Sequence, residues 1–226
     1  MLAYYFYKER YFMGKVNQIG RSMVEMLGVL AIIGVLSVGA IAGYSKAMLK
    51  YKMNKQAEQL NTVFNLASRY NKQIKYNDAT SHSIVGMFIK LGELPKEMLK
   101  NNVTTSIYDI FKNQINISVY GQKYETGESW NPAGATIVGI SLAASENDAN
   151  ISICRNVINV AKENKDSIWY LETIGTGDSR VQTTYYGDNH CTTNCIATLT
   201  LNKIDAMCRG FVEQNIATMR FNVWWK

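Results

Sequence analysis

The sequence predicts an α+β protein in which one long N-terminal helix packs against an antiparallel β-sheet. Two patterns in the chain of 226 residues support this fold class. First, an apolar run passes into an amphipathic stretch without an intervening proline, which is typical of one continuous helix. Second, several short segments with a strand-like pattern follow. A run of strands after a single long helix favours an antiparallel sheet packed on that helix.

The apolar run covers residues 26–44, which are 19 consecutive residues without a charged side chain. As an α-helix this run would be roughly 28 Å long, about the thickness of the hydrocarbon core of a bilayer. The sequence contains no second run of this kind. We therefore expect a single membrane-spanning segment at about 24–44.

After Tyr44, apolar side chains recur mostly at three- and four-residue steps, with Lys, Gln and Asn between them. They are Met48, Tyr51, Leu60, Phe64, Ala67, Tyr70 and Ile74. This spacing predicts a helix with one apolar face. Joined to the apolar run, it predicts a helix of about 50 residues, assigned to 21–72, whose second half packs on a globular head formed by 73–226.

The head is expected to contain both helices and strands. A short helix is predicted at 83–91, because Gly92 and Pro95 follow it as stop signals, and a longer helix at 147–163. Strands are predicted at 114–120, 135–143, 167–174, 197–201 and 219–224. The GTGD segment at 175–178 is expected to be a β-turn rather than a phosphate-binding loop.

All four cysteines lie in the last third of the chain, at Cys154, Cys191, Cys195 and Cys208. An even number of cysteines beyond a membrane span indicates disulfide bonds in an oxidising compartment, so we place the C-terminal domain outside the cytoplasm. Four cysteines allow three pairings. The alternative is a metal site made by His190 with Cys191, Cys195 and Cys208, although the H-C-x3-C spacing fits no common zinc pattern closely.

Composition argues against two large functional classes. The net charge of +6 is spread along the chain without a long Lys or Arg run, so nucleic acid is not expected as a main partner. Neither of the two histidines, His82 and His190, lies in a sequence pattern typical of nucleophilic catalysis by a serine or cysteine. We therefore expect neither an enzyme nor a protein that uses a cofactor.

One acidic residue, Glu25, stands at the beginning of the apolar run, five residues after Gly20. A carboxylate deep in a membrane costs about 2.5–3.5 kcal/mol on insertion scales, so it is expected to have a partner. The alternative is a residue near the interface that extends to the lipid headgroups or pairs with Arg21 at i,i+4. In a secretory signal the cleavage site follows the apolar region, whereas here the candidate site, Gly20, precedes it.

Gly20, Glu25 and the apolar run after them resemble the class III signal of type IV prepilins. The chain is most similar to the type IVb branch, which includes the toxin-coregulated pilin. Two head segments add to the resemblance, because SICRNVI around Cys154 and KIDAMCRG around Cys208 are similar to cysteine segments of that branch. The resemblance implies the type IV pilin fold, with a C-terminal region bounded by a disulfide.

The resemblance also implies how the chain is processed and assembled. A prepilin peptidase would remove residues 1–20 as a leader, cutting between Gly20 and Arg21, and would N-methylate Arg21. Glu25 of one subunit would then pair with the Arg21 amine of a neighbour. Subunits would leave the inner membrane through an assembly platform and form a homopolymeric filament at the cell surface. Arg21 departs from the family, in which an apolar residue usually opens the mature chain.

The resemblance favours a disulfide between Cys154 and Cys208, and Cys191 would then pair with Cys195 in a small local loop. Small residues let membrane helices approach closely, so four glycines are expected to pack helices together: Gly28, Gly34, Gly39 and Gly43. Two alternatives remain open. One is an uncleaved single-span inner-membrane protein with an extracytoplasmic ligand-binding domain, and the other is a type II secretion pseudopilin or a minor pilin.

Overall fold

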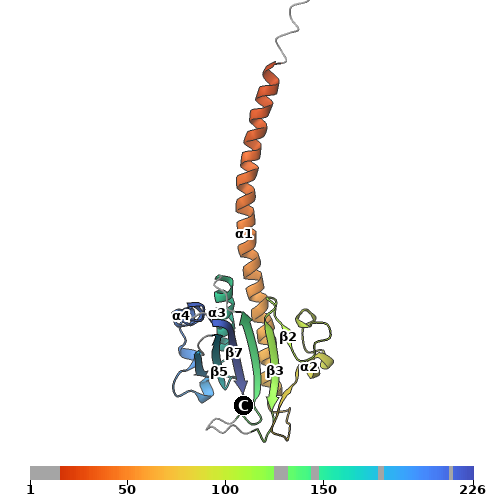
Figure 1. Ribbon diagram of the computed structural model, residues 1–226, viewed down its shortest axis with the longest axis vertical. Coiled ribbons are helices and arrows are strands. Elements are labelled where there is room, and N and C mark those ends of the chain that lie inside the picture. The colour runs from red at the N-terminus through yellow and green to blue at the C-terminus, as the bar shows by residue number, and fades with distance from the viewer. Residues whose placement is uncertain (1–15, 125–131, 144–147, 178–180, 214–215) are drawn as a thin grey trace, which may run out of the picture. The chain divides into compact units, whose positions relative to one another are not determined.

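A computed structural model of the chain (Figure 1) describes residues 16–124, 132–143, 148–177, 181–213 and 216–226. The chain divides into two compact units, residues 1–50 and residues 51–226. The second unit contains the β-sheet and the shorter helices, and the long helix begins in the first unit.

The long helix α1 runs from Val16 to Tyr70 and has 55 residues. The predicted single helix is confirmed, but it begins five residues before Arg21 and so includes part of the expected leader. No proline lies in this stretch, and one glycine costs a helix only about 1 kcal/mol relative to alanine. Nothing between Val16 and Ser22 therefore stops the helix, and its backbone continues through the Gly20–Arg21 bond.

In the described part of the chain, seven strands form one sheet in which all pairs are antiparallel. They are β1 (Ser81–Ser83), β2 (Ile107–Tyr108), β3 (Gln114–Tyr120), β4 (Thr136–Ala143), β5 (Tyr170–Gly177), β6 (Val181–Tyr186) and β7 (Ile216–Trp225). The order is β1-β3-β4-β7-β5-β6, and β2 also pairs with β3. The C-terminal strand β7 thus lies inside the sheet, between β4 and β5 (Figure 1).

The described residues also form three further helices and three short 3-10 turns. They are α2 (Val85–Leu91), η1 (Lys96–Met98), α3 (Asp148–Glu163), η2 (Asp188–His190), η3 (Ile196–Thr198) and α4 (Leu201–Glu213). Helix α2 ends at Gly92, whose φ of +69° lies in the left-handed region that glycine adopts readily. The predicted helices at 83–91 and 147–163 are therefore confirmed to within two residues.

Two predictions for the head are wrong. The strand predicted at 197–201 is replaced by η3 and the beginning of α4. The Thr200 hydroxyl accepts a hydrogen bond from the Lys203 amide (3.2 Å), so this β-branched residue begins a helix. The β-turn predicted at 175–178 is also wrong over Gly175–Gly177, which continue β5. Asp178 lies outside the described residues.

The main core lies between one face of the sheet and the second half of α1. Its buried residues include Leu60, Val63, Phe64, Leu66 and Ala67 from α1, Ile115, Ile117 and Val119 from β3, and Met219, Phe221, Val223 and Trp225 from β7. The rings of Phe64 and Trp225 meet edge to face, with centroids 5.4 Å apart. This packing confirms the predicted fold class, a long helix on an antiparallel sheet.

One residue of the predicted apolar stripe lies on the exposed side of α1 rather than on the side that packs on the head. Tyr51 is 58% exposed, whereas the polar side chains of Gln56 and Gln59 are buried. The buried face of α1 is therefore partly polar, because it contacts polar partners as well as the sheet. Those partners belong to α3 and to the loop after β2.

A smaller cluster lies on the opposite face of the sheet, because neighbouring residues of a strand point to opposite sides. Its buried members are Ala135, Tyr170 and Trp224. The Trp224 ring stacks on Tyr120 and on Tyr170, with both centroid distances at 5.4 Å. The consecutive tryptophans at the end of the chain thus anchor the two faces of the sheet, Trp225 in the main core and Trp224 in the smaller cluster.

Candidate functional site

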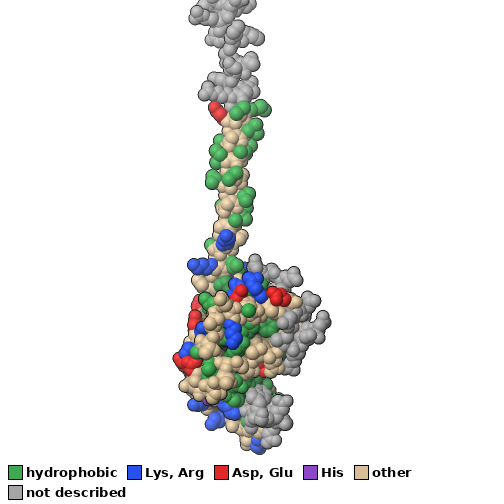
Figure 2. All heavy atoms as spheres, turned by 90° about the vertical axis from the view of Figure 1, so that its left-hand side faces the viewer, with side chains coloured by type: hydrophobic (Ala, Val, Ile, Leu, Met, Phe, Trp, Pro, Cys, Tyr) green, Lys and Arg blue, Asp and Glu red, His purple; other side chains and the backbone are tan. Residues whose placement is uncertain are grey.

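The first part of α1 exposes apolar side chains on all sides. Figure 2 shows hydrophobic side chains along this stretch of the helix. The large apolar residues are 52–76% exposed: Met23, Val24, Met26, Leu27, Val29, Leu30, Ile32, Ile33, Val35, Leu36, Val38, Ile41 and Tyr44. Contiguous apolar surface of this extent marks a site of membrane or protein interaction.

This stretch also has the length and composition of a membrane span. Among the described residues, the helical segment Met23–Tyr70 is the one that is long and apolar enough to cross a bilayer, and its most apolar window has a mean hydropathy of 2.4. A helix that faces solvent in a soluble protein has one apolar stripe, whereas this one is apolar around its circumference. The segment can therefore anchor the chain in a membrane.

Glu25 lies in α1 at the beginning of this apolar surface, and its side chain is exposed. It is followed by no other charged residue until Lys46. Gly20 and Arg21 lie five and four residues earlier in the same helix, and the side chain of Arg21 falls outside the described part of the structure. One helix therefore carries the expected cleavage bond and the expected assembly carboxylate a single turn apart.

The four glycines of the apolar stretch leave open space beside the helix. At Gly28, Gly34, Gly39 and Gly43, no described atom lies within 4 Å of the position that a Cβ would take. They therefore form shallow places on the surface of α1 where a second helix backbone could approach.

A buried disulfide joins the two helices of the C-terminal region. Cys154 in α3 and Cys208 in α4 are bonded, both are fully buried, and their Cα atoms are 5.9 Å apart. This is the pairing that the resemblance implies. Closing a loop across a sequence separation of 54 stabilises the fold by roughly 4 kcal/mol in the chain-entropy model.

Ion pairs lie beside this disulfide, on the surface shared by α3 and α4. Asp205 of α4 pairs with Arg155 of α3 and with Arg209 one turn further along α4, the latter at 3.1 Å. Desolvation acts to raise the pKa of Asp205, but the hydrogen bonds from Arg209 and Arg155 outweigh it, so the pKa lies below its ordinary value. Sequence analysis missed this group, although the i,i+4 spacing of Asp205 and Arg209 is a signal for a helical ion pair.

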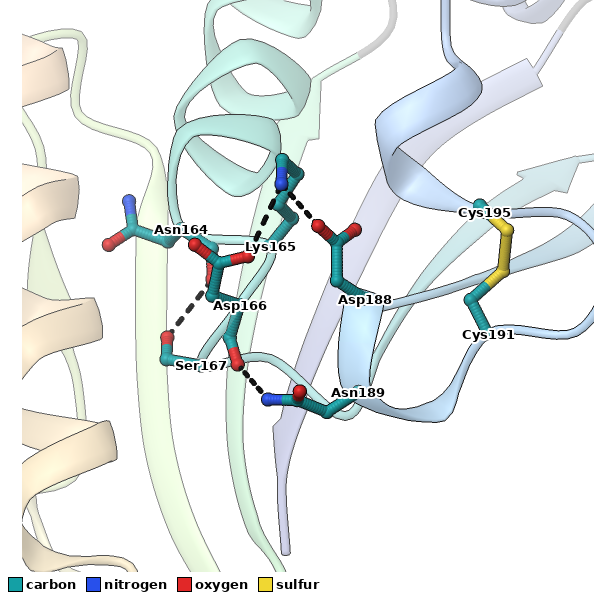
Figure 3. A network of polar contacts seen from close by, with 8 residues as sticks. All are labelled: Asn164, Lys165, Asp166, Ser167, Asp188, Asn189, Cys191 and Cys195. Carbon is teal, nitrogen blue, oxygen red and sulfur yellow. Dashed lines mark hydrogen bonds and ion pairs between the residues drawn. A yellow bond between two sulfur atoms is a disulfide. The ribbon is translucent and has the colours of Figure 1, made fainter.

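The second disulfide joins Cys191 and Cys195, whose Cα atoms are 5.4 Å apart. A polar network holds the chain just before it (Figure 3). Lys165 forms ion pairs with Asp166 and Asp188, and Asn189 donates a hydrogen bond from Nδ2 to the Asp166 carbonyl oxygen at 2.7 Å. Hydrogen bonding to Asp188 and Asp166 raises the pKa of Lys165. The disulfide-bonded loop is therefore attached to the residues that directly follow α3.

The metal site considered from the sequence is not formed. Cys191 and Cys195 are bonded to each other and Cys208 is bonded to Cys154. Within the described residues, no group of three or more His, Cys, Asp or Glu side chains could hold a metal ion. The other histidine, His82, stacks on Tyr76 with ring centroids 3.8 Å apart and contacts Asp78 through Nε2 at 2.7 Å.

The long apolar helix, the antiparallel sheet and the disulfide pair are together compatible with a pilin-like fold. Comparison of the chain with protein-family models, curated proteins and solved structures gives no match.

Proposed function

We propose that this chain is the structural subunit of a type IV pilus, most like the type IVb branch. The prepilin is held in the inner membrane by α1, is processed after Gly20, and polymerises through the apolar part of that helix. The subunits leave the membrane as an extracellular filament. In this proposal the chain is not an enzyme, and its partners are further copies of itself, the prepilin peptidase and the assembly platform.

The observation that carries the proposal is the apolar surface of α1 that surrounds the helix after Glu25. Each square ångström of apolar surface left in water costs about 25 cal/mol, so this segment must be buried in lipid or against other helices. The membrane provides lipid around the segment before assembly, and the filament core provides other helices around it after assembly. A segment that is apolar around its circumference suits both.

In this proposal, Glu25 sets the axial register between neighbouring subunits. Cleavage after Gly20 creates an α-amino group on Arg21, one helical turn from Glu25. Within an apolar bundle, a carboxylate without a partner is strongly unfavourable, whereas a carboxylate paired with the terminal amine of the neighbouring subunit is stabilised. The correct axial offset between subunits is therefore the one that brings these two charges together.

Processing is tested by intact-mass analysis of the protein from its native host. The expected product lacks residues 1–20, with or without one added methyl group. Gly20→Leu should abolish cleavage, whereas Gly14→Leu, five residues before Ile19 rather than before a carboxylate, should leave it unchanged. A full-length wild-type chain in cells that contain a prepilin peptidase would contradict the proposal.

Assembly is tested with Glu25→Ala. This variant should be cleaved normally but should not enter filaments, which are measured by shearing and electron microscopy. The matched control is Glu58→Ala, which removes a carboxylate from the exposed part of α1 where it pairs with Lys55. Filament formation by Glu25→Ala at the wild-type level would exclude the register mechanism.

The competing function is a single-span inner-membrane protein with an extracytoplasmic domain. A membrane-spanning helix and two disulfides suit such a protein equally well. Two measurements distinguish it from the pilin. Its mature chain would retain residues 1–20, and Glu25→Ala would leave its membrane insertion and accumulation unchanged.

A further inference from the structure

Strand β6 lies at one end of the sheet order, with β5 as its sheet neighbour. Its other side would present unpaired backbone groups, which in native sheets are usually protected. At Tyr186, the loop closed by the Cys191–Cys195 disulfide covers this side. The Tyr186 amide donates to the Asn194 carbonyl oxygen at 2.9 Å, and Tyr186 and Cys195 form a parallel β-bridge.

The disulfide sets the conformation of this loop. The bond spans a sequence separation of 4, and within it Asn194 has a φ of +53°, in the left-handed region that few residues other than glycine and asparagine adopt readily. The bond thus holds the Asn194 carbonyl in place for the Tyr186 amide.

The chain on either side of the loop is held independently of the disulfide. Before it, Asp188 pairs with Lys165 and Asn189 donates to the Asp166 carbonyl oxygen, both in the segment that follows α3 (Figure 3). After it, Ile196 and Leu199 are fully buried in the main core. Opening the bond would therefore release residues 191–195 and leave their flanks attached.

The two disulfides differ in their access to solvent. Cys191 and Cys195 are partly exposed, whereas Cys154 and Cys208 are 0% exposed. Thiol–disulfide exchange requires a thiolate to reach one sulfur of the bond, so access governs the rate. The Cys191–Cys195 bond is therefore the more accessible of the two to an external thiol while the head is folded, whereas the Cys154–Cys208 bond must first be uncovered.

We propose that the Cys191–Cys195 disulfide is a redox-sensitive latch that keeps the loop 191–195 on the end of β6, and that a dithiol can open it without opening Cys154–Cys208 or unfolding the head. This inference is independent of filament assembly. Opening the latch exposes the outward amide of Tyr186, which then becomes available to another strand.

The opening step is an ordinary exchange reaction. One thiolate of the dithiol attacks a sulfur of the Cys191–Cys195 bond, which breaks and leaves the other cysteine as a thiolate. The second thiol of the reductant then attacks the mixed disulfide and releases the remaining cysteine. The protein gains two electrons and two protons, and the dithiol is oxidised to its cyclic disulfide.

The first test measures the order of reduction in the full-length protein in detergent. The protein is treated with dithiothreitol, new thiols are trapped with iodoacetamide, and labelled peptides are quantified by mass spectrometry. Cys191 and Cys195 should be labelled at least about tenfold faster than Cys154 and Cys208. Labelling of all four cysteines at one rate would overturn the proposal.

The second test measures hydrogen exchange at single amides. Reduction should speed exchange of the Tyr186 amide by about tenfold or more, because its partner is the loop. The neighbouring Gly187 amide, which donates to the Trp169 carbonyl oxygen at 3.0 Å, is an internal control that should remain protected. Unchanged exchange at Tyr186 after selective reduction, or equal acceleration at both amides, would overturn the proposal.

The double variant Cys191→Ser/Cys195→Ser reproduces the open state without reductant. Its Tyr186 amide should exchange as fast as in the reduced wild type and should not respond to dithiothreitol. A variant in which this amide stays protected would show that the disulfide does not hold the loop. If the variant does not fold, reduction of the folded wild-type protein still decides between the outcomes.

Discussion

Gln56 of α1 donates a hydrogen bond from Nε2 to Oδ2 of Asp109, 2.6 Å away, and both side chains are buried. Asp109 also accepts hydrogen bonds from the Phe111 amide and from the amide and side chain of Asn113. On the other side, Gln56 Oε1 accepts from Asn156 of α3 at 2.9 Å. A chain of buried and partly buried polar groups thus connects α3, α1 and the loop after β2. Because hydrogen bonds are directional, these contacts fix the rotation and axial position of α1 in the head more sharply than apolar contacts would.

Gln56→Ala should lower the free energy of unfolding by about 2–3 kcal/mol, because it removes one donor from a buried carboxylate. The measurement is denaturant unfolding of the full-length protein in detergent, followed by tryptophan fluorescence. Trp225 packs against Phe64 of α1 and reports on the same interface.

The matched control is Gln73→Ala. Gln73 donates from Nε2 to the Arg69 carbonyl oxygen on the exposed surface, so its loss should cost less than about 0.5 kcal/mol. Equal destabilisation by the two variants would show that the buried hydrogen bond contributes no more to the free energy of unfolding than the exposed one.

The two disulfides should differ in their contribution to stability. Replacing Cys154 and Cys208 by alanine should cost roughly 4 kcal/mol, and replacing Cys191 and Cys195 roughly 2 kcal/mol, because the unfolded chain gains more freedom from the longer loop. Thermal unfolding of the two double variants under oxidising conditions measures the order. A larger loss from the pair Cys191 and Cys195 would contradict the loop-length argument.

The regular elements of the fold could be predicted where the sequence pattern is local. β3 occupies 114–120 as predicted, because QINISVY alternates apolar and polar side chains. α1 could be predicted because its apolar run and its amphipathic stretch are both long. Elements that depend on partners were harder to predict.

Helix α4 is an example of such an element. The preceding ATLTL segment has strand-forming residues, yet Thr200 begins a helix there. The side chains of Ile204, Cys208 and Phe211 recur at helical spacing and are all buried. That spacing could have corrected the prediction of a strand at 197–201, because tertiary packing of an apolar stripe overrides β-propensity.

The polar part of the buried face of α1 could not be predicted from its own sequence. Gln56 and Gln59 resemble solvent-facing positions, because their partners, Asp109, Ile110 and Asn156, lie at least about 50 residues away in the chain. Tyr51 is predicted on the packed face because it is an aromatic residue at helical spacing, yet its side chain is exposed. An apolar stripe at helical spacing identifies candidate core residues, but it cannot identify buried polar residues whose partners are distant in the sequence.

Stability should depend on acid through the ion pairs of Asp205. Its pKa is lowered in the folded protein from an ordinary value of 3.8, because the hydrogen bonds from Arg209 and Arg155 exceed the effect of desolvation. A lowered folded pKa means that the stabilisation is complete above pH 3.8 and is lost as the pH falls through the folded pKa. The pH dependence of unfolding below about pH 4 measures this contribution.

The control for this acid dependence is Asp205→Asn, which cannot titrate. The difference in the free energy of unfolding between wild type and variant should shrink as the pH falls below 3.8. A constant difference across this range would mean that Asp205 does not titrate differently in the folded and unfolded states.

The tight junction after β6 requires glycine at position 187. A Cβ there would lie 1.9 Å from the Ile168 carbonyl oxygen and 2.6 Å from the Lys165 carbonyl oxygen, and backbone atoms cannot move away as a flexible side chain could. Gly187→Ala should therefore destabilise the protein by about 1–3 kcal/mol and disturb the network around Lys165.

Gly210→Ala in α4 is the matched control, because no described atom lies within 4 Å of its Cβ position. Since alanine favours a helix by about 1 kcal/mol over glycine, this control should be neutral or more stable than the wild type. In thermal unfolding, Gly187→Ala should have a lower melting temperature than the wild-type protein, and Gly210→Ala an equal or higher one. An unchanged melting temperature for Gly187→Ala would show that the backbone around position 187 can relax.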